Sequence, residues 1–364
     1  MKVLVTGHDG YIGSLLTRIL ADDGHEVVGL DTFYFEGCTL GRHKDDSAYI
    51  RKDLRDVTPL DLAGFDAVCH LAALSNDPLG DLRPELTYDI NHTGSLCLAR
   101  LAKDVGVTRF VFSSSCSLYG SNDSGHPLTE QARFCPLTPY AESKVELEHD
   151  LAAMADDRFS PTYMRNCTAY GVSPKLRGDI VLNNLTAWAF TTGKVKILSD
   201  GTPWRPLVHV EDICRAFLAV LNAPRETVHN EAFNIGRDDE NYQVRDLAEI
   251  VERIVPNCEI EYAGDGSPDP RSYRVDFGKL TRTFPDLELR WTAEKGAHEL
   301  YEAYRTNGLT REQLEGDPYI RLNRLKRLIR EERLDESLRW KPVGVPAALV
   351  PVGSMAELIA TVGE

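Results

Sequence analysis

The chain has 364 residues, of which 42% are hydrophobic and 27% are charged, and this composition is typical of a soluble globular protein with one large domain or two ordinary ones. The formal net charge of −15 argues against non-specific nucleic-acid binding, which requires a basic face. No segment approaches about 20 uninterrupted apolar residues, so we expect no membrane span.

In the first half of the chain, short apolar runs alternate with amphipathic stretches. We expect strands at 3–6, 25–30, 67–71 and 109–113, and helices at 12–23 and 93–104. Strand–helix alternation of this kind predicts an α/β fold, a doubly wound parallel sheet covered by helices on both faces. Such sheets bind ligands at the carboxyl ends of their strands, where the strand order reverses.

After about residue 173 the alternation loosens. We expect a loop at 174–178, an apolar segment at 180–190, a strand at 207–210 whose start is marked by Pro206, a helix at 213–221 and a strand at 232–235. The predicted domains are therefore interleaved. They comprise a nucleotide-binding domain at 1–173 to which 207–236 return, a smaller C-terminal substrate domain at 174–206 and 237–295, and a helical extension at 296–364.

The segment 310–340 reads as one or two helices. Its apolar stripe contains Leu322, Leu325, Leu328 and Ile329, and arginines and lysines from Arg321 to Arg330 fill the other positions. A packing helix with a solvated cationic face is the favoured interpretation, and a surface for an anionic ligand or a partner is the alternative.

Three glycines follow the first strand as Gly7-x-x-Gly10-x-x-Gly13 and open the first helix. Glycines at this spacing permit a tight turn, close approach of the backbone to a pyrophosphate and close packing of helix on strand. Asp31 ends the second strand, where a carboxylate accepts hydrogen bonds from the adenosine ribose and repels a 2′-phosphate. We therefore expect NAD rather than NADP, although an aspartate at this position also caps turns.

Tyr140 and Lys144 lie four residues apart, downstream of the serines at 113–115. Residues at this spacing share a face of a helix, so the lysine can stand beside the tyrosine. A phenol has a pKa of about 10 and needs a nearby cation to act as a base near neutral pH. The pair predicts removal of a proton and a hydride from a secondary alcohol, and an ordinary exposed pair is the alternative.

With these motifs the chain resembles the extended short-chain dehydrogenase/reductase family, and within it the nucleotide-sugar epimerase and dehydratase branch that includes UDP-galactose 4-epimerase. The resemblance covers roughly residues 1–280 and implies a Rossmann fold. The residues that carry it are Gly7, Gly10, Gly13, Asp31, Asp53, Leu54, the run 70–73, Asn91, the serines at 113–115, Tyr119, Gly120, Tyr140 and Lys144.

The resemblance implies roles for the matching residues. Tyr140 is the base for the sugar hydroxyl, Lys144 holds the nicotinamide ribose and lowers the pKa of the tyrosine, and Ser115 hydrogen-bonds the same sugar oxygen. The remaining cofactor-binding residues are expected to be Tyr11, Ile12, Asp53, Leu54, Leu71, Ala72, Ala73, Asn91 and Ser113. For Ser115, a serine that merely ends a strand is the alternative.

Downstream residues fit a nucleoside-diphosphate sugar. Expected substrate contacts are Asn166, Asn183, Asn184, Arg205 and Arg271. Guanidinium groups suit phosphates because they offer paired donors in a plane, whereas a surface salt bridge is the alternative for any single arginine.

The resemblance leaves several reactions open. Dehydratases of the branch usually carry Asp-Glu where this chain has Cys116 and Ser117, so dehydration is disfavoured. A reductase would usually prefer NADPH, which Asp31 disfavours, and a decarboxylase remains open. A 4-epimerase, which oxidises C4 and returns the hydride to the other face, is the leading hypothesis. A non-catalytic nucleotide-binding scaffold is the alternative from another class.

The expected partners and location follow from the same features. The resemblance implies a homodimer, paired through the helices at 93–104 and 141–155. The eight cysteines form no Cys-x-x-Cys pair, so we expect neither a metal site nor a redox pair but reduced thiols. The first residues lead directly into a strand, so we expect no signal peptide and a cytoplasmic protein.

Overall fold

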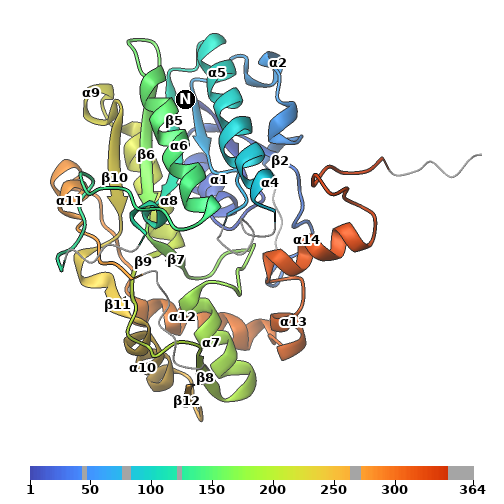
Figure 1. Cartoon of the computed structure of the whole chain (residues 1–364), viewed down its shortest axis with the longest axis vertical. Helices are drawn as coiled ribbons and strands as arrows, with labels where there is room; N and C mark the ends of the chain where they lie inside the picture. The colour runs from blue at the N-terminus through green and yellow to red at the C-terminus, as the bar shows by residue number, and fades with distance from the viewer. Residues whose placement is uncertain (43–46, 76–82, 121–124, 263–271, 343–364) are drawn as a thin grey trace, which may run out of the picture.

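The upper lobe in Figure 1 is built on a seven-stranded sheet in which every neighbouring pair is parallel. The computed structural model describes residues 1–42, 47–75, 83–120, 125–262 and 272–342. Across the sheet the strands are β10 (Glu231–Ile235), β6 (Ser160–Asn166), β5 (Arg109–Ser115), β4 (Ala67–His70), β1 (Lys2–Thr6), β2 (Glu26–Asp31) and β3 (Ala48–Arg51). The predicted doubly wound parallel sheet is confirmed.

Helices cover both faces of this sheet because its side chains alternate between two apolar layers. Val3 and Val5 of β1 face a core shared with α1 (Gly13–Asp22) and α8 (Val210–Asn222), whereas Leu4 faces a core shared with α5 (Ser95–Asp104) and α6 (Pro139–Met154). The strand order reverses at β1, whose two neighbours are β2 and β4. A ligand crevice is therefore expected beyond the carboxyl ends of β1 and β4.

The helix predicted at 93–104 begins earlier than the apolar spacing indicated. Pro84 opens α4 (Pro84–Thr87), which continues through a wider π-helical segment, η2 (Tyr88–Gly94), into α5. Pro is favoured at the first helical position because its fixed φ suits a helix start. Helices α5 and α6 pack together in Figure 1, and the pairing of two copies through them stays a prediction.

A second, smaller lobe has its own apolar core. Its main helices are α7 (Val181–Thr192), α10 (Val244–Ile254) and α12 (Ala293–Asn307). Its strands are β7 (Thr168–Tyr170), β9 (Trp204–His209) and β11 (Asn241–Gln243) in one sheet, and β8 (Lys194–Ile197) and β12 (Glu259–Tyr262) in another. Figure 1 shows this lobe below the large sheet.

The strand predicted at 207–210 is wrong in its bounds, because β9 starts at Trp204 and Pro206 lies inside it, opposite Asn241. Val210 begins α8 instead of ending the strand. Within the segment 207–236, α8 and β10 join the layers of the large sheet, whereas β9 pairs with β7 and β11.

The short elements complete the described chain. They are η1 (Leu54–Asp56), α2 (Pro59–Leu62), η3 (Cys116–Tyr119), α9 (Arg225–Val228), η4 (Asp238–Glu240), α11 (Gly278–Thr283), α13 (Arg311–Glu315) and α14 (Arg321–Arg330). The segment predicted to hold one or two helices at 310–340 thus contains α13 and α14. In the described part of the chain, no helix has the length and apolar character needed to cross a membrane.

Candidate active site

A cavity of about 820 Å³ lies at the carboxyl ends of β1, β2, β4 and β5, and the smaller lobe forms its opposite wall. This volume is near the upper end of the range for small-molecule sites. The sheet contributes the glycine turn and the serines that end β5, whereas α7, β8 and β9 contribute residues of the second lobe. The cavity therefore spans the predicted cofactor site and the predicted substrate site.

The glycine turn is packed so tightly that side chains are excluded from it. A Cβ on Gly13 would lie 2.2 Å from the carbonyl oxygen of Gly7, and a Cβ on Gly7 would lie 2.8 Å from the backbone nitrogen of Ala72. Gly7 also has a φ of +73°, which L side chains rarely adopt. Gly10, Tyr11 and Ile12 face the cavity at the start of α1, where a helix N-terminus favours an anionic diphosphate.

Asp31 lies on the cavity wall with both carboxylate oxygens oriented by backbone donors. The backbone nitrogens of Asp9 and Phe33 donate to it at 3.1 and 2.8 Å. Further lone pairs remain for ribose hydroxyls. Asp53 also lines the cavity, but its carboxylate is paired with Arg55, whose Nη2 lies 2.8 Å from Oδ2. Burial alone would raise the pKa of Asp53, but the hydrogen bonds from Arg55 outweigh burial and lower it.

The segment after β4 forms the neighbouring wall. Leu71, Ala72 and Ala73 line the cavity, and the backbone nitrogens of Leu71 and Ala72 donate to the Thr6 hydroxyl at 3.3 Å. Asn91 is not among the residues that line the cavity, and its contact with the cofactor stays a prediction. The Asn91 amide instead accepts from the Leu74 nitrogen at 2.8 Å and donates to the Leu74 oxygen at 3.1 Å, which makes it a support for this wall.

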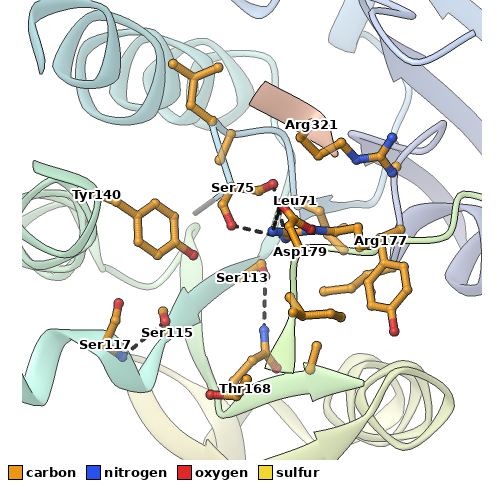
Figure 2. A pocket seen from close by; sticks show the side chains of 18 of the residues that line it. Leu71, Ser75, Ser113, Ser115, Ser117, Tyr140, Thr168, Arg177, Asp179 and Arg321 are labelled. Atoms are coloured by element: carbon orange, nitrogen blue, oxygen red, sulfur yellow. Dashed lines mark hydrogen bonds and ion pairs between the residues drawn. The ribbon is translucent and has the colours of Figure 1, made fainter. Parts of the chain in front are cut away.

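The predicted catalytic residues meet at one end of the cavity. Figure 2 shows Tyr140 from α6 and Ser115 from β5 on the same side, with Ser113 between Tyr140 and the pair Arg177 and Asp179. The ammonium of Lys144 lies 5.6 Å from the centroid of the Tyr140 ring and donates to the carbonyl oxygen of Ser113 at 2.7 Å. Ser115 accepts from the backbone nitrogen of Ser117 at 3.1 Å, which orients its hydroxyl.

Lys144 is almost completely buried, and burial lowers its pKa from 10.5 to about 7. Its ammonium packs against the Phe112 ring, and the nearest compensating carboxylate is Glu148. A phenolate on Tyr140 would place an anion beside Lys144 and favour its protonated form.

The lowered pKa of Lys144 predicts a specific pH dependence of stability in the protein stripped of ligands. The unfolded chain keeps this proton up to about pH 10.5, whereas the folded chain releases it near pH 7. The free energy of unfolding therefore rises with pH across this window, by up to about 1.4 kcal/mol per pH unit from this residue.

The substitution Lys144→Met is expected to remove this pH-dependent contribution to the free energy of unfolding. Urea denaturation at pH 7, 8 and 9 should show wild type gaining stability relative to the variant as the pH rises. The difference between the two proteins isolates Lys144 from other titrating groups. A difference that stays constant from pH 7 to 9 would show that the buried lysine keeps its ordinary pKa.

On the substrate side, Asn166, Asn184 and Arg205 line the cavity. Asn166 donates to the Ser113 hydroxyl at 3.0 Å, and its Oδ1 is buried without a protein partner. The orphaned oxygen is suited to accept a ligand hydroxyl. Arg271 lies outside the described residues.

Asn183 is not among the residues that line the cavity, and its contact with the substrate stays a prediction. It neighbours Asn184 on α7, where successive side chains point about 100° apart. Its amide accepts from the Gly171 nitrogen at 3.0 Å and donates to the Arg177 oxygen at 2.9 Å. Asn183 thus holds the loop that leads into α7.

Several cavity residues carried no sequence signal. Arg177 and Asp179 form a bidentate pair at 2.8 and 3.0 Å, and Arg177 also donates to Ser75, as Figure 2 shows. They lie in a loop, where spacing predicts nothing. Other lining residues that the sequence analysis did not assign to the site include Ser75, Ser117, Lys196, Tyr273 and Arg321.

The two positions where dehydratases carry Asp-Glu have distinct environments here. The Cys116 thiol is buried behind the wall and donates to the carbonyl oxygen of Arg165 at 3.0 Å, whereas Ser117 faces the cavity with its hydroxyl unpartnered. Among the described lining residues the carboxylates are Asp31, Asp53 and Asp179, and each is already engaged. The described wall near Tyr140 therefore offers no spare carboxyl group.

These features fit a dinucleotide and a second ligand. The glycine turn has no room for side chains, and Asp31 lines the cavity with its carboxylate oriented by backbone donors. Asn166 Oδ1 and Ser117 Oγ are buried and have no hydrogen-bond partner in the protein. Asn166 and Ser117 lie beside Ser113 and Ser115, at the end of the cavity that Tyr140 occupies.

Comparison with known proteins identifies the family to which the chain belongs. Residues 3–236 match the NAD dependent epimerase/dehydratase family. The UDP-glucose 4-epimerase of Bacillus subtilis (strain 168) is 29% identical over 328 residues, which are 82% of this chain and 94% of that protein.

Solved structures agree. The NAD-dependent NDP-hexosamine 5,6-dehydratase TunA has a TM-score of 0.75 and 25% identity, covering 84% of this chain and 98% of that one. MoeE5 in complex with UDP-glucose and NAD has a TM-score of 0.71 and 27% identity, covering 85% and 100%. Epimerases and dehydratases thus both occur among the relatives. Because the family model covers most of the chain, this protein belongs to the NAD-dependent epimerase/dehydratase family, and NAD is its cofactor.

Proposed function

We propose that this protein is a 4-epimerase of a nucleoside-diphosphate sugar. The proposal rests on one observation above all, namely that Tyr140, Ser115 and Lys144 converge on the cavity while the described wall beside them has no spare carboxyl group. Epimerisation at C4 requires a base for one hydroxyl, whereas 4,6-dehydration additionally requires an acid and a base at C5 and C6. The residues present meet the first requirement.

The nucleotide end of the cavity favours a diphosphate substrate. Arg205 and Lys196 line this part, which belongs to the smaller lobe, together with Ser199 and Tyr273. Two cations at a cavity wall suit the two phosphates of a nucleoside diphosphate, and Tyr273 offers a ring for a base or ribose. The MoeE5 complex with UDP-glucose and NAD supports the same substrate class.

In the proposed mechanism, NAD supplies the acceptor and donor of the C4 hydride. The Tyr140 oxygen takes the proton of the O4 hydroxyl and later returns it, and Lys144 stabilises the phenolate by its charge. The Ser115 hydroxyl orients the same sugar oxygen. Asn184 and Arg205 hold the rest of the substrate so that the 4-keto sugar can turn within the cavity before it is reduced on its other face.

The direct test is incubation of purified protein with UDP-, dTDP-, GDP- and CDP-sugars, followed by proton NMR. We expect inversion at C4 for at least one of them, without added NAD if the cofactor copurifies. A 4-keto-6-deoxy product would establish dehydration instead, and release of carbon dioxide from a sugar acid would establish decarboxylation. Net consumption of NADH or NADPH would indicate a ketoreductase.

A further inference from the structure

The C-terminal strap, residues 321–340, begins with α14 and lies against the cofactor side of the cavity. Its apolar residues Leu325, Leu328, Leu334 and Leu338 pack with Tyr34, Leu74 and Ile90. Figure 1 shows α14 at the right of the molecule, directly above α13. The predicted apolar stripe of this segment thus packs against the cofactor-binding half of the protein.

The strap is tied to the backbone that follows Asp31. Trp340 Nε1 donates to the carbonyl oxygen of Thr32 at 2.6 Å, and the Tyr34 hydroxyl donates to the carbonyl oxygen of Leu338 at 2.5 Å. Arg339 pairs with Asp53 at 3.3 Å. Thr32, Tyr34 and Asp53 all line the cavity. The strap therefore packs against the outer side of the cavity wall that contains Thr32, Tyr34 and Asp53.

Arg321, the first residue of α14, enters the cavity itself. It is only 2% exposed, its guanidinium stacks 4.0 Å from the Phe35 ring centroid, and its Nη2 donates to the carbonyl oxygen of Lys175 at 2.9 Å. Nη1 is buried and has no hydrogen-bond partner. The prediction of a solvated cationic face is therefore wrong for this arginine.

The charges around Arg321 leave it uncompensated. Lys175 is paired with Asp9 of the glycine turn at 2.7 Å, and Arg177 is paired with Asp179 at 2.8 Å. Each pair is neutral as a unit, so among these five described charges one positive charge remains. Burial lowers the pKa of Arg321 to about 10, so the guanidinium stays protonated at neutral pH. A buried unpaired cation is unfavourable unless a ligand supplies an anion.

We propose that Arg321 binds the diphosphate of the dinucleotide, and that the C-terminal strap thereby clamps the cofactor. Arg321 donates to the backbone carbonyl of Lys175, and the ammonium of Lys175 binds Asp9 of the glycine turn and the carbonyl oxygen of Phe35. The diphosphate of the sugar nucleotide is assigned to Arg205 and Lys196 of the smaller lobe. The inference depends on the dinucleotide alone and holds whichever sugar reaction the enzyme catalyses.

The test uses full-length protein stripped of NAD, with Arg321→Met, Arg321→Lys and the control Arg330→Met, which replaces an exposed arginine of the same helix. ADP and adenosine are titrated by calorimetry, since only ADP carries the diphosphate. We expect Arg321→Met to weaken ADP binding by about ten- to a hundredfold, the range of a charge-assisted hydrogen bond, and to leave adenosine binding unchanged. Arg321→Lys should be intermediate, and Arg330→Met should match wild type.

Melting of the stripped proteins separates ligand binding from folding. Because Arg321→Met removes an uncompensated buried charge, its melting temperature without ligand should hold or rise, while its gain in melting temperature on adding NAD should shrink. Three outcomes would overturn the proposal. They are unchanged ADP affinity, equal loss of ADP and adenosine affinity with a lowered melting temperature, or a loss confined to the sugar nucleotide.

Discussion

Replacement of Tyr140 by phenylalanine is expected to lower kcat by about 10²–10⁴-fold, the usual contribution of a positioned acid or base. The ring would still fill its place on α6, so the cavity wall and the contact with Lys144 should persist. What disappears is the oxygen that takes and returns the O4 proton. The NAD content of the purified variant should therefore equal that of wild type.

The matched control is Tyr262→Phe, which removes a phenol from a side chain that is 58% exposed at the end of β12. It should leave kcat and KM unchanged. Turnover of the sugar nucleotide is followed by NMR, and bound NAD by its absorbance after acid release. A Tyr140→Phe enzyme with full activity would remove the phenolate from the mechanism, and unchanged biological activity in cells despite lost turnover would favour a scaffold.

The parallel sheet was predictable because its strands carry simple apolar patterns. β1 and β4 are buried on both faces and read as continuous apolar runs, and glycines follow β1 where the chain turns. The pair Tyr140 and Lys144 was recognisable for a similar reason, since helical spacing places both on one face. The cofactor half of the cavity could therefore be predicted from local sequence patterns.

The strand β6 escaped prediction because polar residues and a proline flank its two apolar core residues, Tyr163 and Met164. Its sequence contains Pro161, Arg165 and Asn166, and the buried charge of Arg165 is compensated by Glu148 from α6. Partners so distant in sequence leave no periodic signal. Arg321 was misread for the same reason, since the stripe of α14 indicates which face packs but does not identify the cavity that its first residue enters.

The second large effect is expected from Glu148→Ala, which should lower the free energy of unfolding by about 3–5 kcal/mol because it leaves Arg165 buried without its carboxylate. Glu148 and Arg165 are 4% and 5% exposed. Arg165 Nη2 lies 2.7 Å from Glu148 Oε2, and the Ser114 hydroxyl donates to Oε1 at 2.5 Å. Urea denaturation of the NAD-free proteins measures the loss.

Two controls test whether the loss of stability comes from the buried ion pair. Glu302→Ala breaks an exposed pair with Arg305 and should have little effect, because solvent screens such pairs. The double variant Glu148→Leu with Arg165→Met should lose less free energy of unfolding than the sum of the losses of Glu148→Leu alone and Arg165→Met alone. Apolar side chains of similar volume often replace a buried ion pair at little cost. Strict additivity would mean that the pair contributes no coupling. If the double variant loses more free energy of unfolding than Glu148→Ala, Arg165 is held mainly by Tyr119 and the Glu130 carbonyl oxygen, to which it also donates.

The buried pair is also connected to the active site, because Arg165 and Ser114 directly precede Asn166 and Ser115 on adjacent strands. We therefore expect the single variants to show a raised KM as well.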